Sequence, residues 1–199
     1  MKDLPIGMQD FGELRTKNYL YVDKTSYLFQ LTKSSKYYFL SRPRRFGKSL
    51  MISTLAELFR GNKTLFNGLW IENQWDWTKT YPVLDFRFNN ASYKISGLEA
   101  FLHEELSMQA EAFKLNLREA PYPQQFEELI INLSSKHGQV VVLIDEYDKP
   151  IIDYLENISQ AEANREILKN FYSILKPLDA HLRFVMLTGV SKFSQVSIF

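Results

Sequence analysis

Short apolar runs recur along the chain, at residues 37–40, 83–88, 140–144 and 184–187. Long stretches in which apolar residues recur at three- and four-residue steps separate them. Strands that alternate with helices form parallel sheets, so the pattern predicts an α/β fold with a mainly parallel central sheet. The run 140–144 is apolar throughout, which predicts a central strand covered on both faces. The run 83–88 alternates apolar and polar residues, and a half-exposed strand is expected there.

Three long amphipathic helices are expected after residue 95. Their predicted starts are two capping boxes and one proline: Ser96 with Glu99, Pro123, and Ser159 with Glu162. The apolar stripe of the first helix continues to Leu117. Residues 61–81 hold all three tryptophans without a clear period, and we expect an irregular insertion there.

Composition narrows the class of protein. The 199 residues are 45% hydrophobic, and 24 Lys and Arg balance 23 Asp and Glu, so no excess of positive charge points to nucleic acid or anionic lipid. The absence of cysteine excludes disulfides and thiol nucleophiles. No apolar run approaches the roughly 20 residues that cross a bilayer, and residues 1–11 do not resemble a secretory signal. We expect one domain over residues 1–199, cytoplasmic and without a membrane partner.

The segment 37–58 carries the strongest chemical signal. An apolar run leads into a basic loop, then into Gly47, Lys48 and Ser49, then into an amphipathic helix. Backbone N–H groups at a helix N-terminus, with the helix dipole, bind phosphate oxygens. The predicted nucleotide-binding residues are Arg44, Arg45, Phe46, Gly47, Lys48, Ser49 and Leu50. Lys48 would contact the outer phosphates, and the Ser49 hydroxyl would bind Mg²⁺.

The match to the general phosphate-loop motif GxxxxGK[ST] is incomplete. Arg42 stands where that motif has its first glycine, and Pro43 favours an extended conformation for Arg42, so the loop is expected to turn differently at its start. The alternative is that the Gly-Lys-Ser sequence arose by chance and that residues 42–45 are a solvated basic surface.

A second signal stands at the end of the run 140–144. Asp145 and Glu146 follow it directly, and ligands of parallel sheets bind beyond the carboxyl ends of the strands. Asp145 is the candidate Mg²⁺ ligand together with Ser49, and Glu146 the candidate base for the attacking water. The alternative is that Asp145 and Asp148 cap a helix that begins near Pro150, and for Asp148 capping is the favoured interpretation.

Two weaker candidates remain open. Thr188 or Ser191, after the last strand, could lie beside the terminal phosphate as a catalytic residue, or Thr188 and Gly189 could form a simple turn. Thr25 could cap a helix over residues 26–31 whose N-terminus faces the base or ribose, and capping alone is the simpler interpretation.

The sequences RPRRFGKS, VLIDEYDKP and MLTGVSKFS, in this order, resemble the AAA-ATPase-like family of prokaryotic P-loop proteins. YVDKT, at residues 21–25, is similar to a motif that precedes the first strand in that family. The resemblance implies a three-layer αβα P-loop NTPase of the additional-strand type. It also implies a Walker A motif with Lys48 and Ser49, a Walker B motif with Asp145 and Glu146, a sensor position within residues 188–191, and ATP with Mg²⁺ as cofactors.

Members of that family commonly continue into a helical region and a segment similar to PD-(D/E)xK nucleases. Since the sequence stops at Phe199, we expect it to lack the helical lid. Arginine fingers usually come from later sequence or from another subunit, and Arg44, Arg45 and Arg60 are the nearby candidates in this chain.

The leading hypothesis is Mg²⁺-dependent ATP binding with slow hydrolysis, acting as a molecular switch. One alternative is a nucleotide-responsive interaction module without useful hydrolysis. Another is the ATPase part of a nucleic-acid-processing protein, with nucleic acid reached only through C-terminal regions outside this sequence. A homo-oligomer also stays open.

Overall fold

The computed structural model describes residues 2–89 and 92–191. Within them, one all-parallel sheet has the strand order β1-β4-β3-β2. Its strands are β1 (Tyr37–Ser41), β2 (Val83–Arg87), β3 (Val140–Asp145) and β4 (Leu182–Gly189). All four predicted strands and the parallel α/β class are therefore confirmed, and β3 lies between two neighbours as its continuous apolar run predicted.

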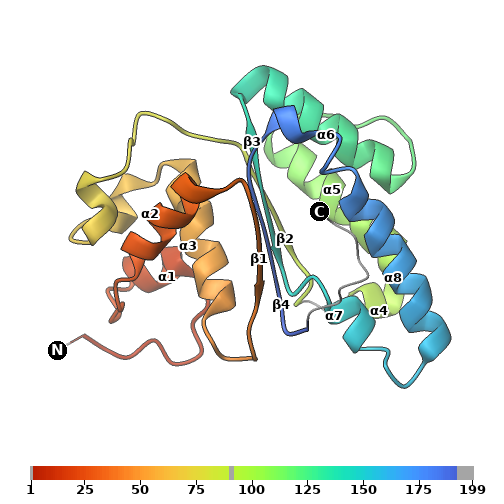
Figure 1. Cartoon of the computed structure of the whole chain (residues 1–199), viewed down its shortest axis with the longest axis horizontal. Helices are drawn as coiled ribbons and strands as arrows, with labels where there is room; N and C mark the ends of the chain where they lie inside the picture. The colour runs from red at the N-terminus through yellow and green to blue at the C-terminus, as the bar shows by residue number, and fades with distance from the viewer. Residues whose placement is uncertain (1, 90–91, 192–199) are drawn as a thin grey trace.

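Helices cover both faces of the sheet (Figure 1). One face carries α1 (Phe11–Thr16), α2 (Thr25–Ser34) and α3 (Lys48–Arg60). The other carries α5 (Leu98–Ala112), α6 (Tyr122–His137) and α8 (Ile158–Ser173). The short elements are α4 (Tyr93–Ser96), α7 (Lys149–Ile152) and the 3-10 turns η1 (Lys63–Phe66), η2 (Trp70–Asn73) and η3 (Asp179–His181). The carboxyl ends of the strands lie at the lower edge of the sheet in Figure 1, beside α4 and α7.

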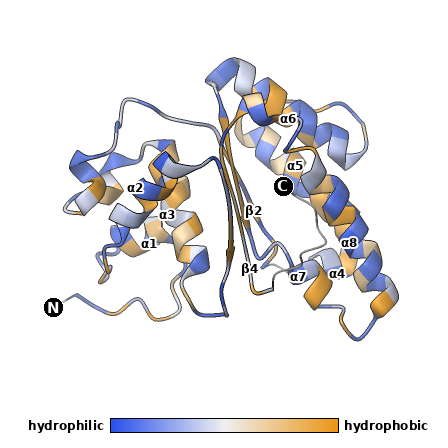
Figure 2. Cartoon of the chain, in the orientation of Figure 1, coloured by the Kyte–Doolittle hydropathy of each residue, from blue (hydrophilic) through white to orange (hydrophobic). Residues whose placement is uncertain are grey.

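The core is divided by the sheet because side chains alternate between its faces. Val140, Val142 and Ile144 pack into the cluster beneath α5, α6 and α8. Val141 and Leu143 pack with α2 and α3 on the other face. Every residue of β3 is buried, and Figure 2 shows the strands as a hydrophobic layer between helices that each carry a polar side.

Two of the predicted helix starts are wrong. α5 begins after Gly97, whose φ of 85° separates it from the short helix α4, so Ser96 ends a helix instead of capping one. α8 begins at Ile158 because the Asn157 side chain accepts a hydrogen bond from the Gln160 N–H and takes the capping position. The start near Pro123 is confirmed, with the proline in the first turn of α6.

Two other expectations concern the ends of elements. α5 ends at Ala112, before Leu117, and Lys114 just beyond it has a left-handed φ of 55°. Residues 61–81 form the turns η1 and η2 instead of a long element, as their irregular pattern predicted.

Across the part of the chain that the structure describes, no helix has both the length and the apolar character that a membrane crossing requires.

Candidate functional site

The basic loop, residues 42–47, joins the carboxyl end of β1 to the first residue of α3. The Arg42 N–H donates to the Gly189 carbonyl over 3.1 Å, so the backbone stays extended beside β4 at the position where the general motif has glycine. Arg45 and Gly47 then adopt left-handed φ values of 68° and 75°. The loop therefore turns later than a glycine-initiated loop would, and its last turn leads directly into α3.

Lys48 is folded back over this loop. Its side chain is buried, and its ammonium group donates to the carbonyls of Arg42 at 3.0 Å and Pro43 at 3.1 Å. These two bonds keep the positive charge inside the curve of the loop, next to the N-terminus of a 13-residue helix. Both features favour an anion at this position.

A cavity of about 710 Å³ opens over the basic loop. Three groups of residues line it: residues 6–9 of the N-terminal segment, the basic residues and first helical turn that the sequence predicted, and Glu146 from beyond β3. The predicted residues in its wall are Arg44, Arg45, Gly47, Lys48, Ser49 and Leu50. Residues about 100 positions apart in the sequence thus share one cavity, and three of them are cations.

Asp145 and Thr188 lie at the carboxyl ends of the neighbouring strands β3 and β4. Neither of them lines the cavity, which includes Glu146, the residue after Asp145. Asp145 is the last residue of β3, is fully buried and accepts a hydrogen bond from the Thr188 hydroxyl on its Oδ1 atom. Its Oδ2 atom is buried and has no hydrogen-bond partner among the described residues. Buried carboxylate oxygens are normally paired, so this oxygen has capacity for a cation or a donor that the described residues do not supply.

Glu146 carries the second acidic group at the edge of this cavity. Its backbone has a left-handed φ of 56°, which costs free energy for a residue with a side chain and is common at functional sites. Burial and the negative charge of Asp145 raise the pKa of the Glu146 carboxyl above its usual range, while Lys149, Lys48 and Arg44 oppose that shift. A raised pKa suits a group that accepts a proton.

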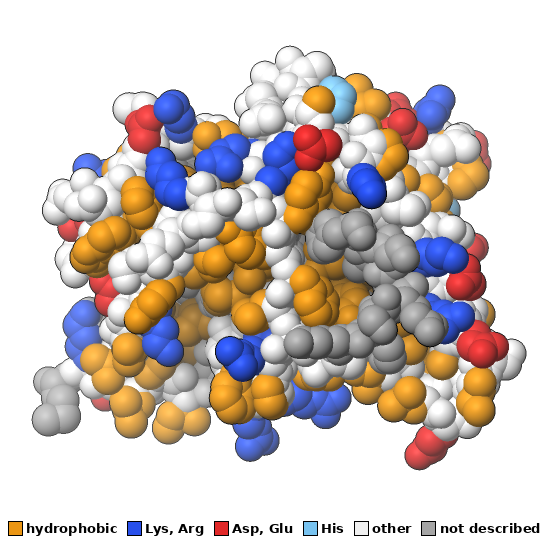
Figure 3. Space-filling view, viewed as in Figure 1, with side chains coloured by type: hydrophobic (Ala, Val, Ile, Leu, Met, Phe, Trp, Pro, Cys, Tyr) orange, Lys and Arg blue, Asp and Glu red, His pale blue; other side chains and the backbone are white. Residues whose placement is uncertain are grey.

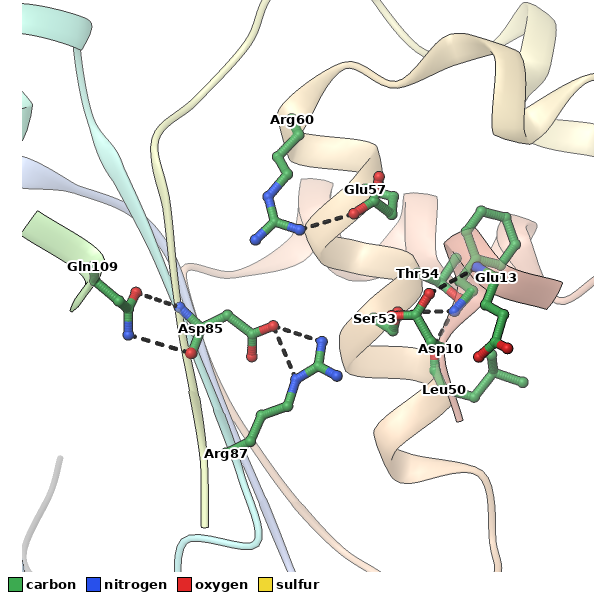
Figure 4. A network of polar contacts seen from close by, with 11 residues as sticks. Asp10, Glu13, Leu50, Ser53, Thr54, Glu57, Arg60, Asp85, Arg87 and Gln109 are labelled. Atoms are coloured by element: carbon green, nitrogen blue, oxygen red, sulfur yellow. Dashed lines mark hydrogen bonds and ion pairs between the residues drawn. The ribbon is translucent and has the colours of Figure 1, made fainter. Parts of the chain in front are cut away.

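Arg87 is a residue of this region that the sequence patterns did not single out. It is the last residue of β2, in register with Asp145, and it binds the Asp85 carboxylate through Nε at 3.0 Å and Nη2 at 2.6 Å (Figure 4). Burial lowers the pKa of the Arg87 guanidinium, but the ion pair with Asp85 outweighs it and the net shift is upward. The only signal in the sequence was its place at a strand end, which the alternation of residues 83–88 had marked as half-exposed.

Hydrogen bonds of Asp10 hold the N-terminal segment, whose residues 6–9 line the cavity, against α3. The Asp10 carboxylate accepts hydrogen bonds from the Glu13 N–H at 2.8 Å and from the Ser53 hydroxyl at 3.1 Å, and the Phe11 N–H donates to Ser53 at 2.9 Å (Figure 4). Ser53 belongs to α3. The segment that lines the cavity is thereby held on the same helix that begins with Lys48.

A second, apolar cavity of about 460 Å³ lies beside the first and shares Gly47 and Leu50 with it. Phe46, predicted to bind nucleotide, lines this cavity instead of the charged one. Phe46, Val22 and Tyr27 in its wall are 69%, 68% and 67% exposed. Figure 3 shows hydrophobic side chains at the surface of the half of the molecule that α1 to α3 form. Exposed apolar residues gathered at one place are typical of a binding surface.

Three predicted roles do not fit the structure. Thr25 caps nothing: the N-cap of α2 is Lys24, and the Thr25 hydroxyl donates to Asp23 and accepts from the Ile71 N–H. Arg60 lies at the far end of α3, about 18 Å along the helix axis from Lys48, and pairs with Glu57. Asp148 stands at the N-cap of α7 but makes no capping bond there with its side chain.

Ser191 lies close to the acidic strand end, bonded to Asp148. Thr188 is part of β4 and not of a turn. Residues 192–194, the end of the MLTGVSKFS motif, lie outside the described residues.

Over residues 5–199 the chain matches the family described as "Predicted AAA-ATPase", and it belongs to that family. It is 47% identical, over 201 residues, to a protein of Azotobacter chroococcum mcd 1 named "Uncharacterized protein in vnfD 5'region". That alignment covers 100% of this chain and 39% of the relative, so the chain spans well under half of the relative's length. No solved structure matches the chain. The family expected from the three motifs is confirmed.

Proposed function

We propose that this chain is a P-loop NTPase domain of the additional-strand type that binds ATP with Mg²⁺ and hydrolyses it slowly, as a molecular switch. The observation that carries the proposal is the shared cavity of Lys48 and Glu146, with Asp145 beside it at the carboxyl edge of the sheet. The strand order β1-β4-β3-β2, with the basic loop after β1 and the acids after β3, supports the additional-strand type.

The triphosphate would lie over the basic loop. The first N–H groups of α3 would bind the phosphates, and Lys48, Arg44 and Arg45 supply positive charge around the same cavity. The Lys48 ammonium would exchange its bonds to the carbonyls of Arg42 and Pro43 for phosphate oxygens. Since these carbonyls are in the exposed part of the loop, water can take the place of the ammonium there.

The residues present fit a magnesium ion. The unpartnered Oδ2 atom of Asp145 and the hydroxyl of Ser49 are oxygen donors of the kind that Mg²⁺ binds. When bound, the ion would neutralise charge that develops on the phosphate oxygens. Asp145 would bind the ion through Oδ2, and the Thr188 hydroxyl orients its other oxygen.

Glu146 is the proposed base. Its carboxylate would accept a proton from the water that attacks the terminal phosphorus, while the bond from that phosphorus to the bridging oxygen breaks and leaves ADP and phosphate. Thr188 is proposed to lie beside this reaction centre from the neighbouring strand end. Because the pKa of the Glu146 carboxyl is raised, its carboxylate is a stronger base than that of an exposed glutamate.

The apolar cavity suits the base of the nucleotide. It adjoins the charged cavity at Gly47 and Leu50, and Lys24 is the charged residue among those that line it. Aromatic and aliphatic walls accept a flat purine ring, and Tyr27 and Phe46 supply aromatic surface at its rim.

Two substitutions test the function. Lys48→Ala should weaken binding of a nonhydrolysable ATP analogue about ten- to a hundredfold, because it removes a charged hydrogen-bond donor. Glu146→Gln should bind ATP normally and lose phosphate release. Lys79→Ala, which removes an exposed lysine paired with Asp76, is the control and should change neither. Unaltered nucleotide binding by Lys48→Ala would refute the proposed site.

A nucleotide-responsive module without useful hydrolysis is the second candidate. The position of Arg60 favours this candidate. Arg60 lies at the far end of α3, so of the three arginine-finger candidates only Arg44 and Arg45 line the charged cavity. In that case the wild-type chain would bind ATP, and its phosphate release would equal that of Glu146→Gln.

A further inference from the structure

The carboxylate of Asp148 binds a segment far along the chain instead of its own helix. Its Oδ2 atom accepts hydrogen bonds from the Val190 N–H at 2.9 Å, the Ser191 N–H at 2.7 Å and the Ser191 hydroxyl at 2.5 Å. Asp148 is 1% exposed. Three hydrogen bonds to one buried carboxylate oxygen make this contact a firm connection between the two segments.

The neighbouring Tyr147 holds the same segment. Its N–H donates to the Thr188 carbonyl at 2.9 Å, and its hydroxyl donates to the Ser191 carbonyl at 3.1 Å. The ring lies so close to Gly189 that a Cβ atom there would come within 2.5 Å of it. Residues 147 and 148 together contact each of the four residues 188–191.

This arrangement bears on the proposed metal ligand. Thr188, which Tyr147 binds through its carbonyl, donates its hydroxyl to Asp145 Oδ1. The strand end 145–148 and the segment 188–191 are therefore joined at three residues, Asp145, Tyr147 and Asp148. The Asp148 contact limits the freedom of the segment that presents Thr188, and Thr188 in turn orients Asp145.

A capping role alone does not account for the side chain of Asp148. The residue is at the N-cap position of α7, yet its carboxylate makes no bond to the N–H groups of that helix. α7 is a four-residue helix, and the acid at its C-cap, Asp153, binds Lys149, Lys94 and Tyr93. Asp153 thus joins α7 to α4, whereas Asp148 joins α7 to the end of β4.

We propose that Asp148 is a positioning residue of the proposed ATPase site: by holding Val190 and Ser191 it keeps Thr188 against Asp145 and so orients the metal ligand. The proposal rests on the proposed function. It predicts different effects on two parts of binding. The hydrogen bonds of the Asp148 side chain go to residues 190 and 191, whereas the same segment meets the basic loop at another residue, where the Gly189 carbonyl accepts from the Arg42 N–H. Nucleotide binding without metal should not depend on Asp148.

The test compares nucleotide binding with and without metal. A nonhydrolysable ATP analogue is titrated into wild type, Asp148→Asn and Asp153→Asn at a series of Mg²⁺ concentrations and in a chelator. Asp148→Asn keeps the shape of the side chain and removes its charge. It should raise the Mg²⁺ concentration for half-maximal binding about tenfold, the lower end of the loss seen when an outer partner of a metal ligand is removed. Its affinity in chelator should stay at the wild-type value.

Asp153→Asn is the matched control, because Asp153 is the acid at the other end of α7 and its side chain bonds to Tyr93, Lys94 and Lys149. The Mg²⁺ dependence of this variant should match wild type. Ser191→Ala removes one of the three donors and should give a smaller shift in the same direction, which decides the question if Asp148→Asn does not fold. Wild-type Mg²⁺ dependence in both variants, or equal losses with metal and in chelator, would overturn the role of Asp148 and leave the ATPase proposal intact. Failure of the wild-type chain to bind the analogue would overturn both.

Discussion

The two halves of the candidate site are built in opposite ways. The basic half, residues 42–47, is exposed throughout. The acidic half, residues 145–148 with residues 188–191, is largely buried, and its carboxylates and hydroxyls bond to one another. A loop that meets a triphosphate can adapt to it, whereas metal ligands must hold a narrow geometry before the ligand arrives. We infer that binding and chemistry place different demands on the two halves.

We expect the largest loss of stability from a substitution that adds a side-chain atom to the closely packed acidic half. Gly189→Ala places a Cβ atom 2.5 Å from the Tyr147 ring and 2.7 Å from Asp148 Oδ1, and neither group can move without breaking its own contacts. We expect the free energy of unfolding to fall by about 1–3 kcal/mol, as in other overpacked cores. Denaturant titration measures this.

Gly12→Ala in α1 is the control for that substitution. The nearest neighbour of its added Cβ atom is 3.2 Å away, so a much smaller loss is expected. Equal losses in the two variants would show that the end of β4 is not tightly packed and would remove the contrast between the halves.

In the basic half, we expect a substitution to destabilise the protein through backbone strain and not through steric overlap. A Cβ atom on Gly47 meets nothing within 4 Å, but the φ of 75° is left-handed. Gly47→Ala should therefore cost roughly 1–2 kcal/mol in stability, with weaker ATP binding. Gly47→Asn should cost less because asparagine tolerates left-handed φ. Unfolding and nucleotide titrations check both, and an asparagine variant worse than the alanine variant would contradict this explanation.

We expect the smallest loss of stability from a substitution at Asp153, just outside the acidic half. Lys149, Lys94 and Tyr93 bind its carboxylate and lower its pKa from 3.8 to about 2, against the effect of burial. A lowered pKa in the folded protein means that the contribution to stability is present at neutral pH and is lost as the pH falls from about 4 to about 2.

Asp153→Asn should therefore lower the free energy of unfolding at neutral pH by about 1 kcal/mol at most, since solvent screens these ion pairs. The difference from wild type should shrink as the pH falls through about 2 and vanish only below that pH. Denaturant titrations over that pH range measure it, and a difference that persists in acid would show that the ion pairs are not its source.

Particular residues show where sequence patterns were sufficient. The apolar run of β3, the strand-loop-helix transition at Lys48 and the acids after Ile144 depend on neighbours in the chain, and each was predicted in place. Side chains with several available partners were predicted poorly. Asp148, Thr25 and Ser96 all have the residue type that caps helices, but in the structure Asp148 and Thr25 bond to distant segments, and Gly97 precedes α5.

The sequence by itself determined the parallel α/β class, the four strands and the family, because periodicity and motifs are local properties of the chain. Only the tertiary structure decided that Glu146 shares a cavity with Lys48, that Arg87 stands in register with Asp145, and that Asp148 holds the segment after β4. The physical reason is that strand order and the pairing of buried polar groups are set by the packing of the whole sheet, which joins residues that no local pattern connects.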